Sequence, residues 1–150
     1  MSPSPTRLHQ VLVLAVAMYL KQVIPGGEVY VAPLDVHIGD GEVVQPDVFW
    51  ISENNDRCVL VNDQYWRGSP DLIVEILSPS TEGLDWREKF DLYEKHGVKA
   101  YWLVSQTYSV HVFRLEDSKF ARQGVFGLDD KFVSQILGEV EVDVRKLLDQ

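Results

Sequence analysis

The sequence lacks the features that mark several large classes of protein. Cys58 is the only cysteine in 150 residues, which excludes an internal disulfide framework and makes a cysteine-based zinc site implausible. That usage suits a reducing compartment, so we expect a cytoplasmic protein. The apolar run at residues 11–20, VLVLAVAMYL, is too short to cross a membrane, and no convincing small-residue cleavage site follows it. A buried first helix is the better interpretation, with no membrane association.

Positive charge is also scarce. The chain has 14 Lys and Arg against 23 Asp and Glu, for a net charge of -9. This balance argues against broad nonspecific binding to nucleic acid, although it leaves room for a local basic patch. Phosphate loops and dinucleotide fingerprints are absent as well. The rest of the composition, 45% hydrophobic and 25% charged, is that of an ordinary soluble domain, and we expect a single domain over residues 1–150.

Hydrophobic periodicity switches between helix and strand along the chain and predicts one α/β domain. Helices are expected at 7–24, 85–96 and 144–148. Strands are expected at 28–38 with a bend near Pro33, at 43–51, 71–77, 99–104, 108–115 and 120–124, and within 135–148. A tight turn at 39–41 joins the first two strands, and residues 54–69 are expected to be irregular apart from a short apolar piece at 58–61. The order of strand, helix and strand over 71–104 suggests a parallel crossover.

The stretch PDLIVEILSP, residues 70–79, has the profile of a central strand covered on both faces. Alternation places Asp71 and Glu75 on the same face of this strand. An ionised carboxylate at Glu75 would cost several kcal/mol unless it is paired or holds a metal. Asp71 and Glu75 are separated by roughly 13 Å along a strand that rises about 3.3 Å per residue, so they cannot readily share one ion. Glu75 therefore needs an acidic partner from a neighbouring strand.

Asp47 is that partner if the second and third strands are neighbours. Two carboxylates from adjacent strands, with backbone carbonyls and water, make a hard oxygen site for Mg²⁺ or Mn²⁺. Such an ion can polarise a phosphodiester and activate water for attack. The alternative, that Asp47 only caps a strand beside the turn at Pro46, fits the sequence about equally well.

A phosphoryl-transfer site also needs a cation, and Lys89 is the candidate. Trp86, Phe90 and Tyr93 define the inward stripe of the second predicted helix, and Lys89 lies at the edge of that stripe. Tyr93 itself is expected to be a core residue. Helical spacing alone favours a different interpretation, in which Lys89 extends along the surface and pairs with Asp85, four residues earlier.

These residues stand in blocks that resemble a known family. Asp47, then DLIVE at 71–75, then Lys89 in the next helix is similar to the PD-(D/E)XK nuclease superfamily. More closely, VQPDV, PDLIVEILSPST, DWREKFDLYEKHGV and AYWLV resemble, in order, the blocks of the Uma2 family of bacterial endonucleases, long carried as a domain of unknown function. The resemblance covers roughly residues 9–104. It implies a restriction-endonuclease-like mixed sheet flanked by helices with an αβββαβ core, here without the family's extra N-terminal helix and strand.

The same resemblance implies roles for individual residues. Asp47 and Glu75 match the ligands of a catalytic Mg²⁺ or Mn²⁺, and Lys89 matches a catalytic lysine that has moved from the strand to the helix. Asp85 is expected to hold Lys89 in place, and Asp71 is expected to bind backbone amides or a loop of the domain instead of the metal. The substrate implied is nucleic acid, most naturally DNA, cleaved by a homodimer.

His9 is the remaining candidate. The superfamily often has a glutamate in the first helix, and here that helix offers His9 as the only ionisable group suited to the role. It would hold a metal-bound water or a phosphate; the alternative is a histidine satisfied at a helix end. A second hypothesis for the whole chain is a nuclease-fold binding or interaction module that has lost its chemistry, which the acidic net charge motivates.

Overall fold

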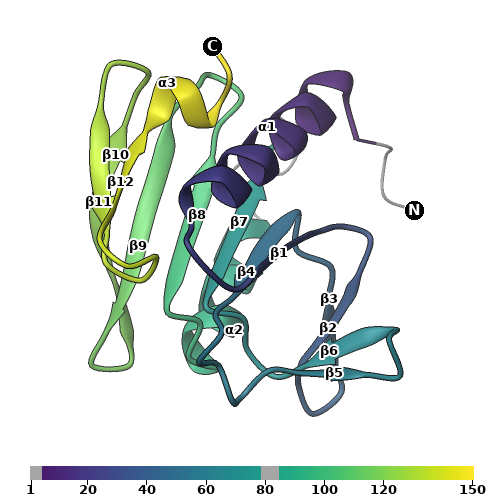
Figure 1. Ribbon diagram of the computed structural model, residues 1–150. Helices are drawn as coiled ribbons and strands as arrows, with labels where there is room; N and C mark the ends of the chain where they lie inside the picture. Colours follow the sequence, from purple (N-terminus) through teal and green to yellow (C-terminus); the bar gives the residue numbers. More distant parts are fainter. Residues whose placement is uncertain (1–4, 79–84) are drawn as a thin grey trace.

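The protein is built on a six-stranded mixed sheet with helices on both faces. The structure, a computed structural model, describes residues 5–78 and 85–150 (Figure 1). The strands of this sheet run in the order β1 (Glu28–Val31), β4 (Val48–Ile51), β7 (Leu72–Ile76), β8 (Ala100–Val104), β9 (Val110–Glu116) and β10 (Lys119–Phe126). All neighbours are antiparallel except β7 and β8, which are parallel. The predicted crossover and the αβββαβ core, α1–β1–β4–β7–α2–β8, are therefore confirmed.

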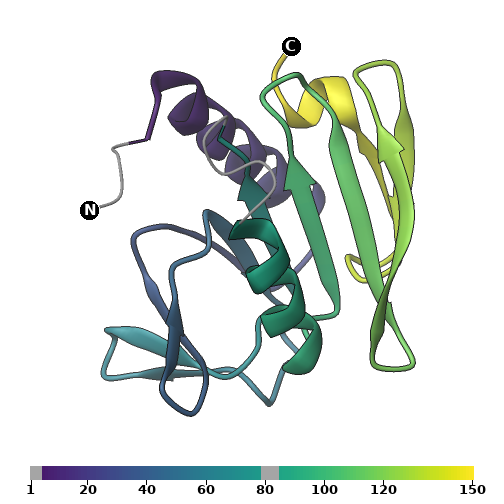
Figure 2. The same ribbon diagram turned by 180° about the vertical axis from the view of Figure 1, so that it is seen from behind.

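Two helices cover the two faces of the sheet (Figures 1 and 2). Helix α1 (Arg7–Val23) packs on one face against residues such as Leu72, Val74 and Ile76. Helix α2 (Asp85–Lys95) lies on the other face, where Ile73 and Tyr101 form the second core. All residues of β7 are buried, because both of its faces are covered, and this explains its unbroken apolar run.

A smaller four-stranded sheet contains the strands that immediately precede β4 and β7 in the chain. Its strands run in the order β3 (Glu42–Val44), β2 (Asp35–Gly39), β6 (Tyr65–Arg67) and β5 (Val59–Val61). The expected strands 28–38 and 43–51 are therefore each divided between the two sheets. The breaks fall at Pro33 and Pro46, since a proline has no N–H to donate to a sheet ladder. The hairpin at 39–41 is confirmed by the antiparallel pairing of β2 with β3.

The prediction that residues 54–69 would be irregular outside the apolar piece at 58–61 was wrong at β6, which pairs with β5 of that piece to form a hairpin. Asn62 and Asp63 in its turn have φ of 53° and 57°, values that asparagine and aspartate tolerate better than most residues. The hairpin strands have only three residues each, and this length leaves too few positions for alternation to show in the sequence.

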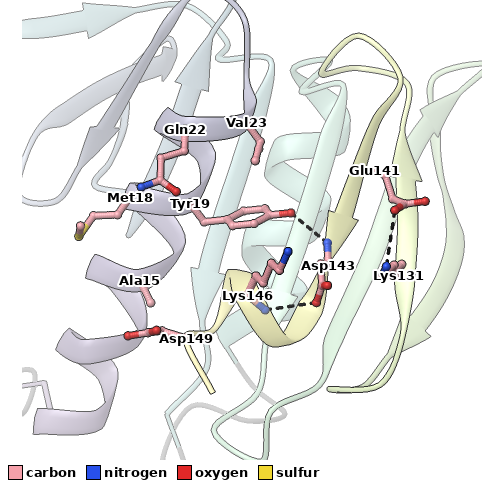
Figure 3. Close-up of a pocket in the computed structure, with 10 residues that line it drawn as sticks. All are labelled: Ala15, Met18, Tyr19, Gln22, Val23, Lys131, Glu141, Asp143, Lys146 and Asp149. Atoms are coloured by element: carbon pink, nitrogen blue, oxygen red, sulfur yellow. Dashed lines mark hydrogen bonds and ion pairs between the residues drawn. The ribbon is translucent and has the colours of Figure 1, made fainter.

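The C-terminal region forms a two-stranded sheet of β11 (Lys131–Ser134) and β12 (Val140–Asp143), followed by α3 (Val144–Leu147). The short helix was predicted; β11 was not. This region packs on the same core as α1, and the backbone N–H of Asp143 donates a 3.0 Å hydrogen bond to the hydroxyl of Tyr19 (Figure 3). In the described part of the chain, no helix has both the length and the apolarity that crossing a membrane requires.

Candidate active site

The structure brings Asp47 and Glu75 together on neighbouring strands. Strands β4 and β7 pair antiparallel with Val48 opposite Val74, so Asp47, just before β4, lies beside the end of β7 that carries Glu75. Oδ2 of Asp47 accepts a 2.8 Å hydrogen bond from the backbone N–H of Ile76. That bond anchors the Asp47 carboxylate one residue beyond Glu75. The expected adjacency of the two strands is confirmed.

Glu75 is an almost fully buried carboxylate with two side-chain partners. Its exposed fraction is 6%. The hydroxyl of Tyr93 donates to Oε1 at 3.0 Å, and the ammonium of Lys89 donates to Oε2 at 3.4 Å. Burial raises the pKa of Glu75 to about 7, and the charge of Asp47 adds to the rise, while Lys89 and Tyr93 oppose it. A positive ion between the two carboxylates would relieve both the burial cost and the repulsion.

Helix α2 supplies both of these partners from one face. Lys89 and Tyr93 are four residues apart, which places them one above the other on a helix. Tyr93 is fully buried, whereas the Lys89 side chain is 42% exposed and reaches Glu75 from the solvent side. The Lys89 ammonium thus lies at hydrogen-bonding distance from Glu75. Asp85 is the first residue of α2, and its side chain lies outside the described residues.

His9 lies in the first turn of α1 and contacts the other carboxylate. Its Nε2 is 3.2 Å from Oδ2 of Asp47, and both side chains are mostly buried. Thr6 begins the helix by accepting a 3.1 Å hydrogen bond from the backbone N–H of His9, which fixes where this turn starts. The other ring nitrogen, Nδ1, is buried, and no hydrogen-bond partner for it lies in residues 5–78 or 85–150. His9 is therefore placed to orient Asp47.

Asp71 lies apart from this group. It comes just before the first residue of β7, whereas Glu75 is next to the last. Its Oδ2 accepts 2.8 Å hydrogen bonds from the backbone N–H of Ser52 and from the side-chain amide of Asn55. Its Oδ1 is 3.5 Å from the ammonium of Lys99. These contacts tie the loop after β4 to the start of β7, as expected for a carboxylate that binds a loop of the domain.

Two contacts of the site were not predicted from the sequence. Tyr93 was assigned to the core alone, but its hydroxyl reaches Glu75. The spacing of Lys89 and Tyr93 is the signal that could have shown it, because a helix face that presents Lys89 to the strand also presents Tyr93. The hydrogen bond from the Ile76 backbone to Asp47 has no sequence signal, since it depends on strand register.

The donor set suits a hard divalent cation held by few protein ligands. Within the described residues, no group of three or more His, Cys, Asp or Glu side chains is arranged to hold a metal. A bound cation would take the carboxylates of Asp47 and Glu75 from the chain, with backbone carbonyls and water completing the shell. Mg²⁺ commonly binds in this way, because it gives up its waters reluctantly. A groove of about 580 Å³ between α1 and the C-terminal region (Figure 3) contains neither carboxylate.

Comparison with known proteins places these features in context. A family model described as "Uma2: Putative restriction endonuclease" matches residues 1–145. A crystal structure described as a putative nuclease belonging to DUF820, from Anabaena variabilis, is similar with a TM-score of 0.77 and 20% sequence identity, over 99% of this chain and 84% of that chain. Among curated proteins, none matches. At this identity the structural likeness establishes the fold.

Proposed function

The chain belongs to the Uma2 family, and from that premise we propose that it is a metal-dependent endonuclease that hydrolyses phosphodiester bonds of DNA. The family description and the structural relative both support a nuclease. The observation that carries the finer proposal is that Asp47 lies beside Glu75 at one end of the central strands, where Lys89 contacts Glu75. Asp47 and Glu75 would hold Mg²⁺ or Mn²⁺, which when bound polarises the phosphate and lowers the pKa of water.

The other residues of the site have roles that follow from their contacts. Lys89, with its ammonium at the edge of solvent, would stabilise the negative charge that grows on the phosphate during hydrolysis. His9 orients Asp47 through its 3.2 Å contact with Oδ2. The N–H of Ile76 holds the same oxygen, so the Asp47 carboxylate is fixed from two directions.

The test is cleavage of supercoiled DNA, linear DNA and RNA by the purified chain with Mg²⁺ or Mn²⁺. Asp47→Ala and Glu75→Ala should each abolish cleavage, and urea unfolding in metal-free buffer checks that each variant is folded, because the N–H of Ile76 or the hydroxyl of Tyr93 loses its acceptor. Asp129→Ala is the control, since this acidic side chain is 93% exposed and pairs with Arg145. Calorimetry with both metals completes the design. A protein that cleaves no nucleic acid and binds neither metal would instead be a binding module.

We also propose that the chain forms a homodimer through the outer face of α1. Val11, Leu14 and Met18 are 39%, 60% and 53% exposed and lie on one side of this helix. The groove beside them (Figure 3) has charges of both signs at its rim, including Lys146 and Asp149. A patch that meets its own copy about a two-fold axis must be self-complementary, and charges of both signs allow each copy to supply partners for the other.

Light scattering during size-exclusion chromatography tests this interface. The unmodified chain should have the mass of a dimer, and Leu14→Arg should reduce it to a monomer with an unchanged circular dichroism spectrum. Val125→Arg is the matched control, because Val125 is 47% exposed but lies on β10. A monomeric unmodified chain at all accessible concentrations would exclude the dimer.

A further inference from the structure

Two tyrosines pack side by side behind the carboxylate of Glu75. Tyr93 on α2 and Tyr101 on β8 are both fully buried, with ring centroids 5.1 Å apart and planes at 79°. They differ at the hydroxyl. That of Tyr93 donates to Oε1 of Glu75 at 3.0 Å, whereas that of Tyr101 is buried and has no hydrogen-bond partner among the described residues. One ring pair therefore contains a bonded and an unbonded phenol in nearly the same surroundings.

The hydroxyl of Tyr93 is not needed for packing. Its ring lies in a cluster of aromatic side chains that a phenylalanine would fill equally well. What the hydroxyl adds is a contact with one defined oxygen of Glu75. Lys89, one turn earlier on the same helix, contacts the other oxygen. A carboxylate whose two oxygens both accept hydrogen bonds from side chains of one helix cannot rotate freely about its Cγ–Cδ bond.

We infer that Tyr93 is a positioning residue of this site, which holds Oε1 of Glu75 and so fixes the orientation in which the carboxylate meets a divalent cation. The inference rests on the proposed function in that Glu75 is a metal ligand. It goes beyond that function by assigning to Tyr93 the orientation of this ligand. Tyr93 acts through Glu75 and has no part in the chemistry itself.

The observations separate this role from a merely structural one. If Tyr93 only filled space, the hydroxyls of both tyrosines would be equally dispensable for the site. The same substitution in the two positions is therefore a matched pair: Tyr93→Phe removes the bonded phenol hydroxyl, and Tyr101→Phe removes the unbonded one. Both changes keep the ring, and both rings are fully buried.

The first measurement uses metal-free protein labelled with ¹³C at the glutamate side-chain carboxyl. The resonance of Glu75 is assigned by its loss in Glu75→Gln. Tyr93→Phe should shift this resonance, because the hydrogen bond to Oε1 is lost, while Tyr101→Phe should leave it in place. A resonance that Tyr93→Phe does not move would overturn the inference, whether or not the protein is a nuclease.

The second measurement is the dissociation constant of Mn²⁺ or Mg²⁺ by calorimetry, without DNA. Tyr93→Phe should weaken metal binding about tenfold or more, as expected when a residue that orients a ligand is lost, and Tyr101→Phe should change it less than about twofold. Equal effects of the two variants would overturn the inference. If the unmodified chain binds no metal, the proposed function fails; a Glu75 resonance that still depends on Tyr93 would then support the positioning role alone.

Discussion

Asp71 and Glu75 lie at opposite ends of the same strand and begin from nearly the same situation. Both are buried carboxylates, with exposed fractions of 1% and 6%. Each has one lysine ammonium close by: Lys99 is 3.5 Å from Asp71, and Lys89 is 3.4 Å from Glu75. Their sequence signals are the same, an acidic residue on one face of an apolar strand. The structure nevertheless gives them different tasks.

The difference lies in the other donors. Asp71 accepts two 2.8 Å hydrogen bonds from N–H groups of Ser52 and Asn55, which ionised carboxylates accept well. Glu75 has a phenol and a second carboxylate nearby, so burial and repulsion raise its pKa to about 7. A buried carboxylate with enough N–H donors clamps the fold. A buried carboxylate without such donors, such as Glu75, can still bind a cation and is therefore suited to a catalytic site.

The largest expected effect is on stability at the Asp71 end. Asp71→Ala should lower the free energy of unfolding by about 3 kcal/mol, because the backbone N–H of Ser52 and the amide of Asn55 lose their buried acceptor. Glu75→Gln should lower it by less than about 1 kcal/mol at neutral pH without metal. Urea unfolding in the presence of a chelator measures both. Equal losses in the two variants would contradict the distinction.

The same comparison explains what the sequence could predict. β7 and α2 followed from local patterns, because an unbroken apolar run and helical spacing need no knowledge of distant partners. The pairing of Asp47 with Glu75 was conditional on two strands being neighbours, which their register shows. The division of the predicted strands at Pro33 and Pro46 between two sheets depended on long-range pairing. The donors to Asp71 come from a loop nineteen and sixteen residues away, and only the folded chain shows that they converge there.

The next effect concerns pH and belongs to Glu75 alone. Its pKa is about 7 in the folded protein against an ordinary value of 4.5, so the folded state holds this proton more tightly than the unfolded chain. The resulting stability is fully present below the unfolded pKa and is lost as pH rises through the folded one. Relative to Glu75→Gln, the unmodified metal-free protein should lose about 3 kcal/mol from acidic to mildly alkaline pH. Parallel curves of unfolding free energy against pH for the two proteins would exclude a raised pKa of Glu75 in the folded state.

The third test compares Lys89 with Lys99. The expected change in free energy is similar to that of the pH effect, but it is measured as a change in cleavage rate. Lys89→Ala should slow DNA cleavage about a hundredfold and leave metal affinity nearly unchanged, because it removes a stabiliser of charge in the transition state. Lys99→Ala should slow cleavage less than about threefold. Its ammonium is about as close to Asp71, but Asp71 binds a loop of the domain and lies away from Asp47 and Glu75. Single-turnover rates with saturating metal provide the measurement. Wild-type cleavage by Lys89→Leu would remove this lysine from the mechanism.

The smallest expected effect comes from Tyr101, whose buried hydroxyl has no hydrogen-bond partner in the part of the chain that the structure describes. A buried hydroxyl without a partner costs folding free energy, whereas a phenylalanine ring fills the same space without that cost. Tyr101→Phe should therefore raise the unfolding free energy of the metal-free protein by about 1 kcal/mol. Tyr93→Phe should lower it by a similar amount, since its hydroxyl is bonded to Glu75. Thermal and urea unfolding of the two variants give the sign. Destabilisation by Tyr101→Phe would show that its hydroxyl is hydrogen-bonded in solution. The contrast between Asp71, whose carboxylate accepts hydrogen bonds from two N–H groups, and the surroundings of Glu75 would then weaken.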